Sequence, residues 1–459
     1  MVIFYKCAKI GEKPVAGRGF PIFDFRCILQ SMRLFRSGFR HQNLLIFSIS
    51  RGRIGRVMLI GLFSLFSNQF AVAYNRLPDY GPCSDTPKTT SWFKTFFDAH
   101  PDLKKWVSAN GNTKEVQLIY TRIDRGANGN ALLQQEYYRV AAEKRFDPGQ
   151  AAGLPLAILA LERMSQLEDS VGIDKSNTLL IESGGPGLTA GLNDPTTTDG
   201  KPSLSNYLKR MLLVGDPEAY NRIFEFTGRE YIRKGLVSRG YTRLELPARI
   251  GDRFSAAQNR ISNPLIFQDD DLKVIYREPL RQAPAATNRG SDKNGAGLED
   301  LHNLLVSLIA PSRFPKERRF EMKREDQSFL FHYMGLLPTE SILPPYRDDS
   351  LTYCACLRKL LLCGGREGAP MPESLRIFNL SDTANGRLTD VAYFADTAAK
   401  VDFFLSATLI KKPGNVAEAD SSLYFLRELG QAVYQLELKR PRRFPPDLKP
   451  YFSGYTKKQ

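Results

Sequence analysis

Few histidines and cysteines are available for metal binding in this sequence of 459 residues, which contains only four His and six Cys. Cys354, Cys356 and Cys363 lie close together, but their spacing does not match the paired cysteines of zinc ribbons. We therefore predict no metal and no cofactor. In an exported protein, one disulfide among these three residues and Cys83 is one interpretation, and isolated buried thiols are the other.

Nucleic-acid-binding motifs and internal repeats are also absent. The chain has 64 Lys and Arg against 49 Asp and Glu, a formal net charge of +15, and part of this excess lies in residues 1–57. Two interpretations are open: nucleic-acid binding, or a basic extension with a solvated basic surface. Because the basic residues are scattered rather than interleaved with aromatics on one face, we favour the second and predict no nucleic-acid partner.

The apolar run within residues 51–73 is too short for an ordinary membrane span. Three arginines precede about ten apolar residues from Val57 to Phe66, and Ala71-Val72-Ala73 is a small-x-small cleavage pattern. This pattern predicts a signal peptide, hence an exported, periplasmic or secreted protein without a stable span after cleavage. An interfacial or anchoring helix is the alternative. A signal peptide belongs at the start of a chain, so we interpret residues 1–57 as a doubtful N-terminal extension.

The periodicity of apolar residues changes from strand-like to helical and back along the chain. A helix is expected at 91–106, followed by a strand hairpin at 115–124 and 132–140. A long block at about 146–350 is mostly helical. The pattern predicts these further elements: helices at 154–169, 203–214, 217–227, 229–235, 298–309 and 325–335, a flexible loop at 280–297, strands at 374–381, 388–396 and 401–410, and a helix at 421–437. Five strands split by a helical insertion, with terminal helices over one face, indicate an α+β fold.

One helix within this block begins with residues that disfavour a helix. The stretch FDPGQAAGLPLAILALERM (146–164) reads as a buried helix in its second half, but its first half contains Pro148-Gly149 and then Gly153-Leu154-Pro155. Glycine in a helix interior costs about 1 kcal/mol relative to alanine. The sequence therefore places an unusual turn at the entrance of a core helix.

The order of elements and several short stretches resemble the penicillin-recognising serine hydrolases, the class A β-lactamases and DD-peptidases, in a secreted serine-hydrolase branch. The stretches are VQLIYTRIDR (116–125), LPLAILALERM (154–164), YLKRMLLVGDPEAYNRIFEFTG (207–228), NRISNPLIF (259–267), RIFNLSDTANGRLTDVAYFAD (376–396), FFLSATLI (403–410) and LRELGQAVYQLE (426–437). The resemblance covers about 110–437.

The resemblance implies a β-lactamase/transpeptidase-like fold, with a five-stranded antiparallel sheet covered by helices and an inserted all-helical lobe. It divides the chain as follows: an N-terminal linker and helix at 74–110, the β-lactamase-like domain at 111–440 with the helical lobe at about 146–350, and a basic tail at 441–459.

In this family, a serine and a lysine three residues apart in an S-x-x-K motif begin the central helix, and the serine forms an acyl-enzyme. Pro148, Leu154 and Pro155 match the frame of that segment here. Gln150 then occupies the serine position and Gly153 the lysine position. Neither side chain can be a nucleophile or a base, so the first motif is lost.

The second and third family motifs are S-D-N on the helical lobe and K-[ST]-G on the inner strand. They match Gly215-Asp216-Pro217 and Leu380-Ser381-Asp382, respectively, and the register of the third can shift by one or two residues. The hydroxyl and amide of S-D-N are gone, while Asp216 before Pro217 also fits a helix N-cap with proline at the first position. From 377 to 386 there is no cation to bind a substrate carboxylate.

No replacement nucleophile is evident. The pattern Ser91-x-x-Lys94 lies before the first strand, in an expected covering helix, and we attribute it to chance. There is no G-x-S-x-G. His302 and His332 read as core or surface histidines rather than bases. Glu245 is a candidate for the deacylating glutamate by position only, with a surface carboxylate as the alternative.

Three functions remain open. A catalytically degenerate protein with a binding or vestigial cleft is the first, since three motifs are lost together and a fold without its site predicts no activity. An active serine β-lactamase or DD-peptidase acting on β-lactams or cell-wall peptides is the second. The third is a binding module for peptidoglycan fragments or a cell-wall protein.

Overall fold

The computed structural model describes residues 87–141, 143–251, 253–285, 292–364, 371–383, 386–411 and 416–452. The chain divides into two compact units, Met1–Phe70 and Ala71–Gln459, and all described residues belong to the second. The predicted signal peptide and Cys83 therefore lie outside the described residues. Among the residues that are described, no helix is long and apolar enough to cross a membrane.

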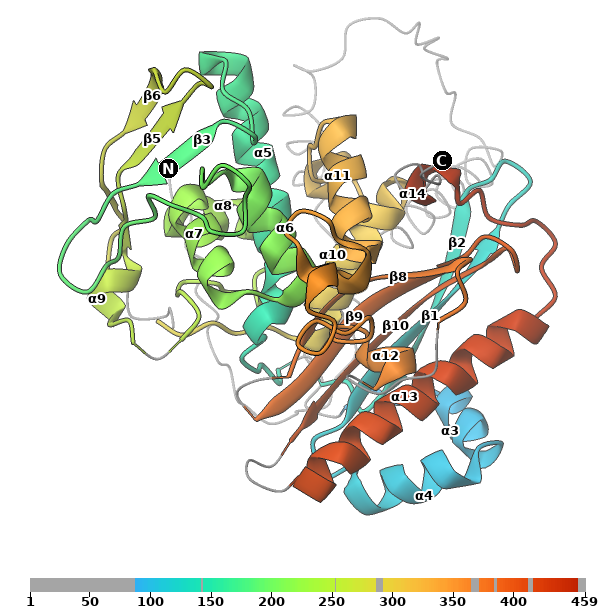
Figure 1. Cartoon of the computed structure of the whole chain (residues 1–459). Helices are drawn as coiled ribbons and strands as arrows, with labels where there is room; N and C mark the ends of the chain where they lie inside the picture. The colour runs from blue at the N-terminus through green and yellow to red at the C-terminus, as the bar shows by residue number, and fades with distance from the viewer. Residues whose placement is uncertain are drawn as a thin grey trace, which may run out of the picture. The chain divides into compact units, whose positions relative to one another are not determined.

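A five-stranded antiparallel sheet runs through the described part of the chain (Figure 1), as the sequence predicts. Its strands are β1 (Gln117–Arg125), β2 (Ala131–Tyr138), β8 (Leu375–Asp382), β9 (Arg387–Asp396) and β10 (Val401–Ile410). The order is β2-β1-β10-β9-β8, with each neighbouring pair antiparallel. Strands from the two ends of the sequence thus pair directly, for example Ile119 opposite Ser406, and β8 is an edge strand.

Alternating side chains on each strand supply two separate cores. On β8, Leu375 and Ile377 pack into one apolar cluster, whereas Phe378 and Leu380 pack into the other. Successive side chains of a strand point to opposite faces, so both faces of the sheet are covered. This explains why β8, β9 and β10 are buried along almost their whole length.

Three helices cover the face opposite the insertion (Figure 1): α3 (Ser91–Asp98), α4 (Pro101–Asn110) and α13 (Val416–Lys439). The single helix expected at 91–106 is wrong, because the chain breaks between α3 and α4. His100 has non-helical torsions (φ −128°, ψ 80°) and Pro101 occupies the first turn of α4. Proline disfavours helical torsions in the residue before it but is suited to a helix start, so it both ends α3 and begins α4.

The insertion between β2 and β8 is mostly helical, and its main helices match the predicted ranges closely. They are α5 (Gly153–Val171), α6 (Leu204–Val214), α7 (Pro217–Thr227), α8 (Arg229–Ser238), α9 (Ala256–Asn259), α10 (Leu298–Ile309), α11 (Arg324–Gly335) and α12 (Leu360–Cys363), with the short η1 (Gly149–Ala152), η2 (Pro311–Arg313), η3 (Lys316–Arg318), η4 (Pro338–Glu340) and η5 (Tyr346–Asp348); α14 (Lys449–Phe452) follows α13.

The prediction that this lobe is all-helical is wrong. It also contains a three-stranded sheet of order β3-β5-β6, and a two-stranded pair of β4 and β7. These strands are β3 (Thr178–Ile181), β4 (Ile261–Ser262), β5 (Leu265–Gln268), β6 (Val274–Glu278) and β7 (Arg281–Gln282). They are at most five residues long, too short for periodicity to separate a strand from a loop.

Candidate active-site groove and the side chains that fill it

The entrance of the central helix packs directly against the edge strand β8. Residues 149–152 form the 3-10 turn η1, and α5 follows from Gly153. Gly149 has φ +49°, and a Cβ there would lie 2.5 Å from the carboxylate of Asp382. The backbone N–H of Gln150 donates to Asp382 Oδ1 at 3.1 Å. The glycine is therefore needed for this close approach, which explains the poor helix start seen in the sequence.

Gln150, at the serine position of the first motif, is buried and makes no contact that resembles a reactive site. Its side chain is 6% exposed. Its Oε1 has no hydrogen-bond partner among the described residues. A primary amide offers neither a nucleophile nor a titratable proton at ordinary pH.

The lysine position is filled by apolar atoms from two other elements. A Cβ on Gly153 would lie 3.2 Å from Sδ of Met211, on α6, and 3.4 Å from Cδ1 of Leu380, on β8. All three residues are buried, and Met211 and Leu380 belong to the same apolar cluster. The space that a lysine side chain would need is thus occupied by the core.

The second motif segment is the junction of two helices. Ser203 caps the N-terminus of α6, and Gly215 ends that helix with φ +67°. Asp216 then caps α7 by accepting from the backbone N–H groups of Glu218 and Ala219, with Pro217 at the first helical position. Asp216 Oδ2 also accepts from Arg210 at 2.6 and 2.8 Å. Asp216 is therefore a helix cap and an ion-pair partner, one of the two interpretations offered by the sequence.

The third motif segment is split between the two faces of β8. Leu380 lies in the core beside Gly153, and Asp382 accepts from Gln150. Ser381 lies between them in sequence and its side chain takes the other face, where its hydroxyl donates to the backbone oxygen of Arg358 at 2.8 Å. The hydroxyl of Ser381 is thus used to hold the chain segment that crosses the edge of the strand.

Arg358 supplies a cation at this place from a segment far away in the sequence. Its guanidinium donates to the backbone oxygen of Ser381. A Cβ on Gly215 would lie 2.5 Å from its Nη1, so the guanidinium rests directly on Gly215. The absence of a cation from 377 to 386 therefore does not leave the site uncharged. Burial lowers the pKa of Arg358, while Asp382 and Asp390 act in the opposite direction.

The neighbouring Lys359 covers the same strand edge. Its Nζ donates to the backbone oxygen of Ile377 at 2.6 Å, to Oδ1 of Asn379 at 2.7 Å and to the backbone oxygen of Met334 at 2.8 Å. Burial lowers the pKa of Lys359 and raises the pKa of the nearby Asp390. Arg358 and Lys359 together donate hydrogen bonds to two outward-facing carbonyls of β8, those of Ser381 and Ile377, which are four residues apart. We name residues 354–363 the edge segment.

The structure thus brings all three motif segments into contact, directly or through Arg358. Gly153 meets Leu380, Gln150 meets Asp382, and Gly215 meets Ser381 through Arg358. The sequence does not predict the edge segment, because no periodic pattern signals that a pair of basic residues folds back onto β8.

The other candidate residues lie elsewhere. Ser91 and Lys94 are exposed on α3, which covers the opposite face of the sheet. Glu245 forms an ion pair with Arg145 at 3.0 Å, and its backbone pairs with Gly295. His332 is half-buried on α11, and its pKa is lowered chiefly by burial.

His302 is a fully buried histidine that joins α10 to the sheet. Its Nε2 and Nδ1 lie 2.8 Å from the hydroxyls of Thr121 on β1 and Ser406 on β10. Burial lowers the pKa of His302 to about 3. It is therefore a neutral structural residue, as the sequence suggested.

A separate pocket opens beside the second motif segment. It encloses about 480 Å³ and is lined by Thr189, Ala190, Asp216, Pro217, Glu218, Arg222 and Arg253. Glu218 is largely exposed, as is Arg253. Both signs of charge therefore face the same cavity.

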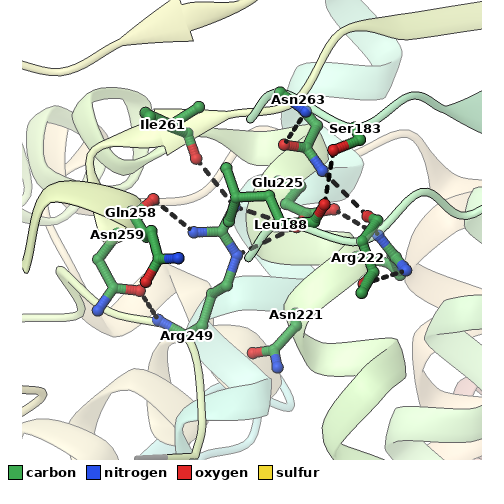
Figure 2. Close-up of polar contacts among 12 residues, drawn as sticks. Ser183, Leu188, Asn221, Arg222, Glu225, Arg249, Gln258, Asn259, Ile261 and Asn263 are labelled. Atoms are coloured by element: carbon green, nitrogen blue, oxygen red, sulfur yellow. Dashed lines mark hydrogen bonds and ion pairs between the residues drawn. The ribbon is translucent and has the colours of Figure 1, made fainter. Parts of the chain in front are cut away.

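A buried polar network fixes the wall of this pocket (Figure 2). Arg249 donates through Nε to Glu225 at 3.0 Å and through its other nitrogens to the backbone oxygens of Gln258 and Ile261 at 2.9 and 2.8 Å. Arg222 donates to the other oxygen of Glu225 at 3.1 Å and to the backbone of Thr189 at 2.7 Å. Burial lowers the pKa of Arg249 even beside Glu225. Arg222, which lines the pocket, is thus held by Glu225 and the backbone of Thr189, although its buried Nε has no hydrogen-bond partner among the described residues.

No cluster suited to a metal ion is present in the described ranges: no three or more His, Cys, Asp or Glu side chains converge there. No disulfide joins Cys354, Cys356 and Cys363 in the part of the chain that the structure describes.

Comparison with solved structures finds β-lactamases among the similar chains. The chain is similar to class A β-lactamases. A β-lactamase from Sphaerobacter thermophilus is 13% identical with a TM-score of 0.43, and the match covers 74% of this chain and 98% of that one. A mutant of the reconstructed class A β-lactamase ancestor of Gram-negative bacteria is also 13% identical, with a TM-score of 0.45 and coverage of 74% and 99%. A β-lactamase from Burkholderia ambifaria is 14% identical, with a TM-score of 0.43 and coverage of 72% and 98%.

No protein-family model and no curated protein sequence matches the chain.

Proposed function

We propose that this chain is an exported, β-lactamase-like protein that has lost serine acyl transfer, a pseudoenzyme whose reactive groove is filled by its own side chains. The main support for this proposal is the position of the Arg358 guanidinium, which is buried between Gly215 and the edge of β8. A substrate lying along this edge would have to displace it.

Chemistry at the matched positions supports the same proposal. Acyl transfer needs a nucleophile, a base and a group that binds the developing or existing negative charge. Gln150 and Gly153 supply neither of the first two. Asp382 points its carboxylate at this place and would repel an anionic substrate, while Arg358 is engaged with the backbone of Ser381. Removing members of a catalytic set together leaves little residual rate.

A fluorescent penicillin tests the loss of acyl transfer. We expect no covalent label on the folded protein after prolonged incubation, because no serine lies at the entrance of α5. An active penicillin-binding protein is the positive control, and Arg358→Ala is the matched variant. If Arg358 only blocked access to a working nucleophile, its removal would allow labelling. Because we propose that the nucleophile itself is missing, we expect the variant to stay unlabelled. A labelled serine mapped to the groove in either protein would establish an active acyl-transfer enzyme instead.

Binding of peptidoglycan fragments or a cell-wall protein is a second candidate function, favoured by the 480 Å³ pocket. Because its rim presents the carboxylate of Glu218 and the guanidinium of Arg253, it suits a short peptide that carries both an amino and a carboxylate group. The hydrogen bonds that hold the lining residue Arg222 to Glu225 and Thr189 support a preformed site. This pocket lies beside the filled groove, so its occupation does not require the edge segment to move.

Titration with soluble muropeptides tests this second candidate. Arg253→Glu should weaken binding by about tenfold or more, since reversing one contacting charge changes the free energy of binding by at least about 1.4 kcal/mol. Arg277→Glu, at an exposed position of β6, is the control for the change in net charge and should bind like the wild type. Equal weakening by both variants would mean a non-specific effect of charge, and no binding by the wild type would exclude this ligand class.

A further inference from the structure

The edge segment carries two cysteines that flank Arg358 and Lys359. Cys356 precedes these two residues and Cys363 follows them. The thiols are 9% and 1% exposed, respectively. Cys354 lies just outside the pair and is half-buried. The groups that fill the groove therefore sit inside a short loop bounded by Cys356 and Cys363.

The backbone of this loop turns back so that its two ends approach each other. The N–H of Lys359 donates to the backbone oxygen of Cys356 at 3.0 Å, and the N–H of Cys363 donates to that of Lys359 at 3.1 Å. Leu362 has φ +99°, a conformation that a branched side chain rarely adopts. The Cys356 and Cys363 side chains are in hydrogen-bonding contact, and this contact together with burial raises the pKa of the Cys363 thiol.

Helix α13 holds the strained turn in place. A Cβ on Gly430 would lie 2.6 Å from the backbone nitrogen of Leu362, so the helix backbone presses directly on the turn. Gln431 Nε2 donates to the backbone oxygen of Leu362 at 3.2 Å. Residues held in sparsely populated torsions persist only where the surroundings fix them. The backbone turn that immediately precedes Cys363 is therefore fixed by its packing against α13.

We propose that Cys356 and Cys363 are a disulfide-forming pair, and that the disulfide locks Arg358 and Lys359 over the edge of β8. The co-reactant is a disulfide oxidant such as oxidised glutathione. One cysteine thiolate attacks the oxidant to give a mixed disulfide and one released thiol. The other thiolate then displaces the second thiol. Two protons and two electrons leave the pair, and one disulfide of the oxidant becomes two thiols.

The proposal does not depend on residual acyl-transfer activity, because it concerns the edge segment and not the residues at the three motif positions. Cys354 provides an internal comparison. It lies in the same short segment but is not part of the contact between Cys356 and Cys363. If closeness in sequence alone decided the pairing, Cys354 would form a disulfide as readily as Cys356.

Peptide mapping by mass spectrometry tests the bond. The full chain is refolded with reduced and oxidised glutathione, its remaining thiols are alkylated, and the cross-linked peptides are identified. We expect Cys356 joined to Cys363 and an alkylated Cys354. The variant Cys354→Ser should give the same link, and Cys356→Ser should lose it. Free thiols at both positions in the wild type, or a link from either of them to Cys354, would overturn the proposal without any variant.

Trypsin tests the lock, since it cuts after Arg358 or Lys359 only when the edge segment opens. We expect cleavage at these sites to be at least about tenfold slower in oxidised than in reduced protein, measured on gels run after reduction. Cys354→Ser should keep this difference, and Cys363→Ser should abolish it. Equal cleavage rates in oxidised and reduced wild type would show that the disulfide does not hold the edge segment against β8.

Discussion

Replacing Gly153 by lysine should destabilise the protein by about 3–5 kcal/mol, the effect expected for a buried charge without a partner. The substitution restores the residue type that the resemblance assigns to this position, but the space is closed. Its Cβ alone would lie 3.2 Å from Met211 Sδ and 3.4 Å from Leu380 Cδ1. The rest of the side chain would have to push these core residues apart and carry an ammonium group among them.

Urea unfolding followed by circular dichroism measures this loss. Gly153→Ala separates crowding from charge and should change the free energy of unfolding by no more than about 1 kcal/mol, because helix propensity and crowding oppose each other. Ser170→Lys adds the same charge at an exposed position of α5 and should be nearly neutral. A Gly153→Lys protein as stable as the wild type would mean that the groove opens readily, and the proposed occlusion would then fail.

His302 should make the folded state sensitive to acid over a defined range. Its folded pKa of about 3 lies below the usual value of 6.5. Between these values the unfolded chain binds more protons, so the stabilisation is complete above pH 6.5 and is lost as the pH falls toward 3. At about 1.4 kcal/mol for each pKa unit, the contribution of this one residue approaches about 4–5 kcal/mol.

Unfolding free energies measured from pH 7 to pH 4 in wild type and His302→Gln give this contribution by difference. The glutamine variant should lose less stability on acidification, since it has no imidazole to protonate. Ser406→Ala is the matched control: it removes the hydroxyl 2.8 Å from Nδ1 but keeps the buried ring, so its acid sensitivity should persist at a lower overall stability. Parallel pH profiles for wild type and His302→Gln would contradict the assignment.

The sequence predicts the large elements of this fold well, for physical reasons. Strands of eight to ten residues such as β8, β9 and β10, and amphipathic helices such as α6, carry many repeats of their period. Short strands such as β3 and β5, with four residues each, carry only two repeats of the strand period. The break at His100-Pro101 depends on one proline, which is visible in the sequence but does not by itself decide between a kink and a new helix.

The candidate site is predictable only in part. Gln150, Gly153 and Gly215 are identified by their places in the sequence, and the structure brings their segments together. The residue that lies against Gly215 is Arg358, 143 positions further along the chain. A single sequence contains local patterns and not this long-range contact. Two features hint at it in retrospect: adjacent basic residues in an apolar stretch, and two cysteines that bracket them.

The position of the edge segment on β8 has a further consequence for association between molecules. An edge strand with free N–H and C=O groups is a template onto which a strand of another chain can add. On β8 the outward carbonyls of Ile377 and Ser381 are already hydrogen-bonded by Lys359 and Arg358. Arg358 and Lys359 thereby reduce the number of free backbone groups on β8 with which a strand of another molecule could pair, and the edge segment should limit association through this strand.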